Sequence, residues 1–142
     1  MILRFTAKGG TVAAFLRVLV VEDFVPFQRF IASTLAKRRD LQIIGEVADG
    51  LEAVQKAEEL RPDLILLDIG LPTMSGIEAA RQIRRCAPES KIIFVSQTFS
   101  SEIVQAGLSL GALGYVLKTR AERDLLPAVE AAIRGKQFVS GA

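Results

Sequence analysis

Polar side chains stand at the ends of four aliphatic stretches of the chain. Glu22 and Asp23 follow the stretch "VLVV", Asp68 ends "LILLD", Ser96 ends "IIFVS" and Lys118 ends "GYVLK". One polar residue is common where a strand reaches water, so no single position would indicate a site. Three carboxylates, a hydroxyl and an ammonium at corresponding ends of successive strands indicate a charge-coupled cluster.

Side chains of these types can bind a metal ion and handle a phosphoryl group. Carboxylates held within a few ångströms repel one another and need a cation, and an oxygen-only set of ligands suits Mg²⁺. One carboxylate can then attack phosphorus, while the metal, the hydroxyl and the lysine stabilise charge on the phosphoryl oxygens. The product of that reaction would be an acyl phosphate.

The composition excludes several other kinds of chemistry. The chain has no histidine, so it has no Ser-His-Asp triad, no histidine metal ligand and no phosphohistidine of its own. Its net charge is +2, and its densest basic run, residues 37–39, is short and followed by Asp40, so we expect no nucleic-acid binding by this chain itself. A single cysteine, Cys86, cannot form an internal disulfide, which favours a cytoplasmic location.

The elements that must position the cluster alternate along the chain. Apolar runs alternate with stretches in which apolar residues recur every three or four positions, as on one face of a helix. The five strands that this pattern predicts are residues 17–23, 41–49, 63–68, 91–96 and 114–118. Parallel strands need long crossovers, so the pattern predicts an α/β fold, with a doubly wound five-stranded parallel sheet and helices on both faces.

Several helix boundaries are also predicted. Asp49 followed by Glu52, and Ser75 followed by Glu78, are capping pairs that favour helix starts at these positions. We expect Asp124 to cap the last helix. The carboxyl ends of parallel strands meet at one edge of such a sheet, and ligands bind there, so the polar cluster lies where a site is expected.

The length of 142 residues fits one domain. We expect residues 17–138 to form it, residues 1–16 to be an extension of unknown role, and residues 139–142 to be a tail or the start of a linker. The N-terminal apolar patch is interrupted by Arg17 and lacks a signal-peptide cleavage site. The uncharged run at 103–117 contains three glycines and is short for a bilayer span, so no membrane partner is expected.

The quoted blocks resemble the receiver domain of two-component response regulators. The segments "VLVVED", "DLILLDIGLPTMSGIEAARQIR", "IIFVS" and "GALGYVLK" match that family in order, over about residues 17–138. "EVADGLEAV" and "LLPAVEAAIRGKQFVS" are similar to the NarL/LuxR-type group. The resemblance implies a flavodoxin-like sheet with strand order 2-1-3-4-5.

The resemblance also implies roles for the acidic residues. Asp68 would be the phosphoacceptor. Asp23 and Asp68 would bind Mg²⁺ directly, together with the backbone carbonyl of Gly70. Glu22 would act on the metal mainly through a bound water.

Two further side chains would bind the phosphoryl group, and a third would report on it. By resemblance, Ser96 and Lys118 would contact the phosphoryl oxygens, and the ring of Tyr115 would turn inward when Ser96 moves. Gln97 and Thr119 depart from the residues usual in the family at these positions. Gln97 would narrow access to the phosphoryl group.

The implied function is signalling by phosphorelay rather than enzymatic turnover. A histidine kinase would be the phosphoryl donor, and a homodimer is a further expectation. Relatives usually continue into a DNA-binding domain, so the chain is either a stand-alone receiver or the receiver of a transcription regulator. DNA would then be contacted only through that additional C-terminal domain.

Other protein classes fit the sequence less well. A P-loop nucleotidase needs a G-x-x-x-x-G-K-[ST] motif, which the chain lacks. A haloacid dehalogenase-type phosphatase needs a second acid where Gly70 stands, and a flavodoxin needs a phosphate loop where the chain has "EDFVPF". The remaining alternative is a pseudo-receiver that acts as a protein-interaction module without phosphorylation.

Overall fold

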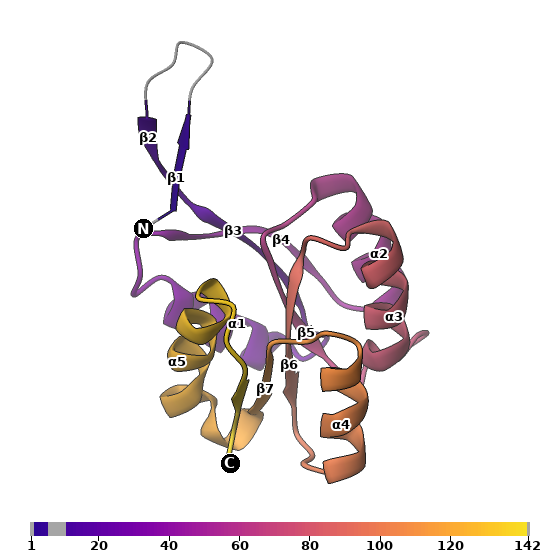
Figure 1. Ribbon diagram of the computed structural model, residues 1–142. Coiled ribbons are helices and arrows are strands. Elements are labelled where there is room, and N and C mark those ends of the chain that lie inside the picture. The colour runs from indigo at the N-terminus through magenta and orange to yellow at the C-terminus, as the bar shows by residue number, and fades with distance from the viewer. Residues whose placement is uncertain (1, 6–10, 142) are drawn as a thin grey trace.

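The computed structural model describes residues 2–5 and 11–141 of the chain. Its main body is a parallel sheet of six strands in the order β4-β3-β5-β6-β7-β8 (Figure 1). The strands are β3 (Leu16–Val21), β4 (Leu41–Val47), β5 (Leu64–Asp68), β6 (Lys91–Ser96), β7 (Gly114–Leu117) and β8 (Phe138–Val139). The predicted α/β fold, with its parallel doubly wound sheet, is confirmed.

Helices cover both faces of this sheet, as predicted. They are α1 (Val25–Leu35), α2 (Gly50–Leu60), α3 (Gly76–Cys86), α4 (Ser101–Ser109) and α5 (Ala121–Ile133). One apolar core lies under α1 and α5, and a second lies under α2, α3 and α4 (Figure 1). Every residue of β5 is buried, because the central strands are covered from both sides.

The first strands of the chain are separate from this sheet. β1 (Ile2–Phe5) and β2 (Thr11–Ala14) pair antiparallel with each other and form a two-stranded ribbon. Figure 1 shows the ribbon extending away from the helices and the main sheet. Within the described residues, no helix combines the length and apolar character that crossing a bilayer requires.

Two predicted helix starts have the expected caps. The Asp49 carboxylate accepts a hydrogen bond from the Glu52 N–H at 2.8 Å, at the start of α2. The Ser75 hydroxyl accepts one from the Glu78 N–H at 3.3 Å, at the start of α3. Each cap satisfies a backbone donor that the first turn of a helix leaves unpaired.

The last helix differs from the prediction at its start. A short 3₁₀ helix, η1 (Lys118–Arg120), leads directly from β7 into α5, so α5 begins at Ala121. Asp124 therefore lies inside the first turn and does not cap the helix. Its carboxylate accepts a hydrogen bond from the Ser140 hydroxyl at 2.8 Å.

The sheet also has one more strand than the predicted five. β8 pairs with β7 in parallel, with Gly114 opposite Phe138 and Tyr115 opposite Val139. A strand of two residues is too short to show an alternating pattern in the sequence, which is why pattern analysis missed it. The expected domain boundary at residue 138 falls inside this strand.

Close packing at Gly76 places α3 against the end of β5. The Gly76 N–H donates to the Ile69 carbonyl at 2.9 Å. A Cβ atom at Gly76 would lie only 2.1 Å from the Asp68 carbonyl oxygen. Glycine is therefore required for α3 to begin this close to the strand end that carries Asp68.

We expect Gly76→Ala to lower the free energy of unfolding by about 1–3 kcal/mol, because the added methyl group collides with backbone atoms that cannot turn aside. Chemical denaturation would measure the change. Gly70→Ala is the matched control, since no atom lies within 4 Å of a Cβ built at that position. Equal effects of the two substitutions would contradict this account of Gly76.

Candidate functional site

The carboxyl ends of β3, β5, β6 and β7 lie side by side at one edge of the sheet. An open pocket of about 350 Å³ lies at this edge. The predicted site residues that line it are Asp23, Asp68, Gly70, Ser96 and Lys118. The structure thus brings together side chains that are widely separated along the chain.

Three carboxylates meet in this pocket region. Oxygen atoms of Glu22, Asp23 and Asp68 lie within 4.8 Å of one another. Glu22 and Asp68 are buried, whereas Asp23 is exposed. Acids this close and this poorly hydrated repel one another strongly unless a cation is near.

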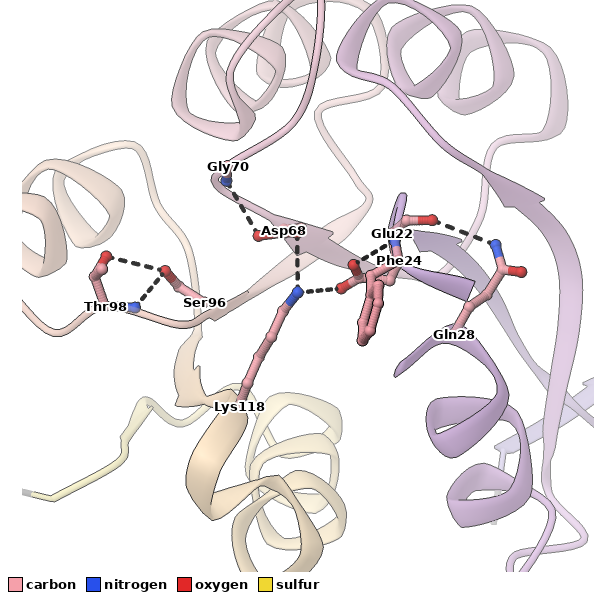
Figure 2. A network of polar contacts seen from close by, with 8 residues as sticks. All are labelled: Glu22, Phe24, Gln28, Asp68, Gly70, Ser96, Thr98 and Lys118. Carbon is pink, nitrogen blue, oxygen red and sulfur yellow. Dashed lines mark hydrogen bonds and ion pairs between the residues drawn. The ribbon is translucent and has the colours of Figure 1, made fainter. Parts of the chain in front are cut away.

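Lys118 supplies one positive charge to the buried acids. Its ammonium nitrogen lies 2.7 Å from Glu22 Oε1 and 3.1 Å from Asp68 Oδ2 (Figure 2). The contact with Asp68 is both a hydrogen bond and an ion pair, and the contact with Glu22 is an ion pair. The ammonium also lies 4.8 Å from the centre of the Phe27 ring, a cation–π contact.

The surroundings shift the pKa values of two of these groups. Burial raises the pKa of Glu22, and the Lys118 ammonium and the Phe24 N–H oppose that rise. Burial alone would lower the pKa of Lys118, but its contacts with Glu22 and Asp68 outweigh burial and raise it. Lys118 therefore stays charged at neutral pH, despite its low exposure.

Backbone groups hold the carboxylates in place. The Phe24 N–H donates to Glu22 Oε2 at 3.0 Å, and the Gly70 N–H donates to Asp68 Oδ1 at 3.1 Å. The Gln28 amide donates to the Glu22 carbonyl at 3.4 Å, from the first turns of α1 (Figure 2). The carboxylates of Glu22 and Asp68 are thus each oriented by the loop that directly follows β3 or β5.

Ser96 is engaged with a neighbouring loop residue. Its hydroxyl accepts a hydrogen bond from the Thr98 N–H at 3.2 Å and lies 3.4 Å from the Thr98 hydroxyl (Figure 2). Sequence reasoning missed Thr98, because a threonine two positions beyond a strand end carries no recognisable signal. Gln28 and Phe27 were missed as well, since both fit an ordinary amphipathic helix.

Tyr115 lies beneath this loop and outside the pocket lining. The ring is 1% exposed, its hydroxyl donates to the Thr98 carbonyl at 2.5 Å, and its edge faces the Phe99 ring. The expectation that the ring turns when Ser96 moves stays a prediction. The ring is already inward, because Thr98 offers its hydroxyl a partner there.

The donor set of the site fits Mg²⁺. The acidic cluster offers only oxygen ligands, and it includes both buried and exposed carboxylates, so a hydrated cation can approach from the pocket. Sulfur and imidazole ligands, which would favour zinc, are absent from this cluster as the structure describes it.

Comparison with known proteins shows which protein family this chain is similar to. The response regulator receiver domain model matches residues 18–130. The chain is 36% identical over 121 residues to the response regulator protein VraR of Staphylococcus aureus (strain Mu3 / ATCC 700698), covering 85% of this chain and 58% of VraR. It therefore spans less than two thirds of that relative's length.

Solved structures show the same fold. A LuxR-family two-component response regulator from Aurantimonas sp. SI85-9A1 superposes with a TM-score of 0.85 at 28% identity, covering 90% of this chain and 91% of that one. The signal receiver domain of NarL from Mycobacterium tuberculosis gives 0.81 at 27% identity, covering 87% and 99%. The family model matches most of the length of this chain, which therefore belongs to the response regulator receiver domain family.

Proposed function

We propose that the chain accepts a phosphoryl group on Asp68 from a phosphohistidine of a histidine kinase, with Mg²⁺ as cofactor. The observation that carries this proposal is the position of Lys118, whose ammonium contacts both Glu22 and Asp68. Such a contact places a positive charge beside the Asp68 carboxylate, where negative charge on a transferred phosphoryl group would need stabilisation. Membership of the receiver family supports the same reading.

In the proposed reaction, one carboxylate oxygen of Asp68 attacks phosphorus. An oxygen–phosphorus bond forms, the phosphorus–nitrogen bond of the donor breaks, and the imidazole leaves with the electron pair of that bond. Lys118 stabilises negative charge on the phosphoryl oxygens, and the Ser96 hydroxyl donates to one of them. The pocket at the sheet edge leaves room for the donor to reach Asp68.

The acidic residues would hold the metal. Asp23 and Asp68, with the backbone carbonyl of Gly70, would bind Mg²⁺ directly, and Glu22 would act through a bound water. When bound, the metal neutralises the carboxylates and draws charge from the phosphoryl oxygens. Asp23 is the exposed member of the set, so a hydrated ion can reach it first.

The loop at residues 97–99 would transmit the effect of phosphorylation at Asp68 to the surface of the domain. Ser96 can donate to a phosphoryl oxygen only after its hydroxyl leaves the Thr98 N–H. Thr98 is also the acceptor for Tyr115, so movement of this residue changes the support of the Tyr115 ring. Helix α4 packs on the same apolar core as that ring and would respond.

A longer parent protein would convert this change into control of transcription. The chain covers 58% of the length of VraR, which leaves room there for a further domain. A solved relative at 28% identity is described as a LuxR-family response regulator. We therefore infer that any DNA is contacted through a separate domain, and the expected homodimer stays a prediction.

We expect Asp68→Asn to abolish Mg²⁺-dependent labelling by radioactive acetyl phosphate, because the amide is a poor nucleophile and removes a metal-binding charge. Glu59→Gln, on the exposed face of α2, is the control and should be labelled normally. Full labelling of Asp68→Asn would sink the assignment. Absence of labelling in the unmutated protein as well would favour the pseudo-receiver alternative.

Asp23→Ala should separate metal binding from phosphoryl acceptance. The substitution removes one charged ligand, so we expect Mg²⁺ affinity to fall by about tenfold or more, an effect of about 1.4 kcal/mol. Labelling of Asp68 should slow at low Mg²⁺ and recover partly as Mg²⁺ is raised. Titration of Mg²⁺ by isothermal calorimetry gives the affinity, and an unchanged value would contradict the proposed ligand set.

Tyr115→Phe tests the role of the bond to Thr98. We expect the free energy of unfolding to fall by about 1 kcal/mol, since the partly buried hydrogen bond from the Tyr115 hydroxyl to the Thr98 carbonyl is lost. Labelling of Asp68 should persist, but the phosphorylation-dependent NMR shifts in α4 should shrink. Phe99→Leu, which removes the ring contact and keeps the hydroxyl bond, is the comparison, and undiminished α4 shifts in Tyr115→Phe would refute the relay.

A further inference from the structure

A buried serine joins the last strand to the site. Ser140 directly follows β8 and is 0% exposed. Its hydroxyl donates to Asp124 Oδ2 at 2.8 Å and accepts from the Leu117 N–H at 3.1 Å. Its own N–H donates to the Tyr115 carbonyl at 2.8 Å. One residue therefore connects β7, β8 and α5.

The bond to Leu117 lies next to the catalytic lysine in the chain. β7 ends at Leu117 and η1 begins at Lys118, so the chain changes direction between these two residues. Pairing of β8 with β7 has stopped at this point, and the serine hydroxyl supplies the acceptor that the short strand does not. The Leu117 N–H is thereby fixed directly before the turn that aims the lysine side chain.

Asp124 fixes the serine in turn. Its carboxylate is buried in the first turn of α5, the helix that follows η1. The hydrogen bond from Ser140 compensates part of the cost of burying that charge. Lys118 is thus held between two points, Leu117 before it and Asp124 after it, and Ser140 bridges them.

We propose that Ser140 is a positioning residue for Lys118, acting through Leu117 and Asp124. Its hydroxyl holds the end of β7 and the start of α5 together, which directs the Lys118 ammonium at Asp68 and Glu22. This inference rests on the proposed phosphoryl acceptance at Asp68. It assigns a role in the site to a segment that the sequence patterns place outside the domain.

The first test compares Ser140→Ala with Val139→Ala. Val139 is the last residue of β8, directly before Ser140, and packs on the core, but its side chain makes no hydrogen bond, so its truncation controls for loss of strand packing. We expect Ser140→Ala to slow the initial labelling of Asp68 by acetyl phosphate about twofold to tenfold, the range that loss of one hydrogen bond supports. Val139→Ala should label at close to the unmutated rate.

Mg²⁺ affinity provides a second readout on the same proteins. The hydrogen bonds of Ser140 do not reach Glu22, Asp23 or Asp68, so Mg²⁺ binding should not weaken in Ser140→Ala. A general loss of structure would weaken Mg²⁺ binding and slow labelling together. That combined result, or equal slowing in Val139→Ala, would overturn the proposal.

A double-mutant cycle asks whether Ser140 acts through the lysine. In a Lys118→Ala background, Ser140→Ala should have no further effect on the labelling rate, because the group that it positions is gone. The same fold reduction in both backgrounds would overturn the proposal.

The last readout does not depend on phosphorylation. We expect Ser140→Ala to move the ¹³Cε resonance of Lys118 at pH 7 in the untreated protein, and Val139→Ala to leave it in place. An unmoved resonance in Ser140→Ala refutes the positioning role even if Asp68 is labelled. If the unmutated protein is not labelled, the proposed function fails, and this resonance still decides the role of Ser140.

Asp124→Ala covers the case in which Ser140→Ala does not fold. It leaves the serine hydroxyl in place but removes its hydrogen-bond acceptor, so the Lys118 resonance should shift, as in Ser140→Ala. No shift in a folded Asp124→Ala protein would count against the proposal.

Discussion

Repulsion between carboxylates at one sheet edge is the constraint on which the rest of this structure depends. Two unit charges 4.8 Å apart repel by roughly 3 kcal/mol at an effective dielectric constant of about 20. That is a large part of the 5–15 kcal/mol or so by which a domain is usually stable. The Lys118 ammonium offsets part of this repulsion, while burial first, and the nearby Asp68 charge to a lesser extent, raise the pKa of Glu22. Binding of a further cation would therefore stabilise this cluster of carboxylates.

The fold places the charges by rigid backbone rather than by long, adjustable side chains. Asp68 ends a fully buried strand, and Gly76 brings the start of α3 against its carbonyl. The one long side chain, Lys118, is confined by Glu22, Asp68 and the Phe27 ring. A lysine would otherwise retain considerable rotamer freedom, and its confinement lowers the entropy lost when it binds an anion.

Much of the fold and of the candidate site could be predicted from the amino-acid sequence. Continuous apolar runs indicate strands buried on both faces, and the capping pairs at Asp49 and Ser75 have local signals within three positions, so both were found. The bonds of Ser140 and Tyr115 were not predicted. These bonds join residues that are far apart in the chain or that lie in an irregular loop. Neither kind of contact produces a periodic pattern or a fixed spacing in a single sequence. Asp124 was misassigned because an acid early in a helix is equally compatible with capping the helix and with bonding a distant partner.

The contacts of Thr98 limit how strongly the proposed switch can act. In the described state Ser96 accepts from a neutral backbone N–H, and Tyr115 donates to the carbonyl of the same residue. Exchanging the bond to a neutral group for one to a charged phosphoryl oxygen gains only about 1 kcal/mol net, since such bonds contribute about 1.5–3 kcal/mol and neutral ones about 0.5–1.5 kcal/mol. A gain of about 1 kcal/mol moves a two-state equilibrium about fivefold. Because the Tyr115 ring already lies inward, little of that gain is needed to reorient it. The remainder can alter the 97–99 loop and the adjoining start of α4, where the change is exposed to a partner.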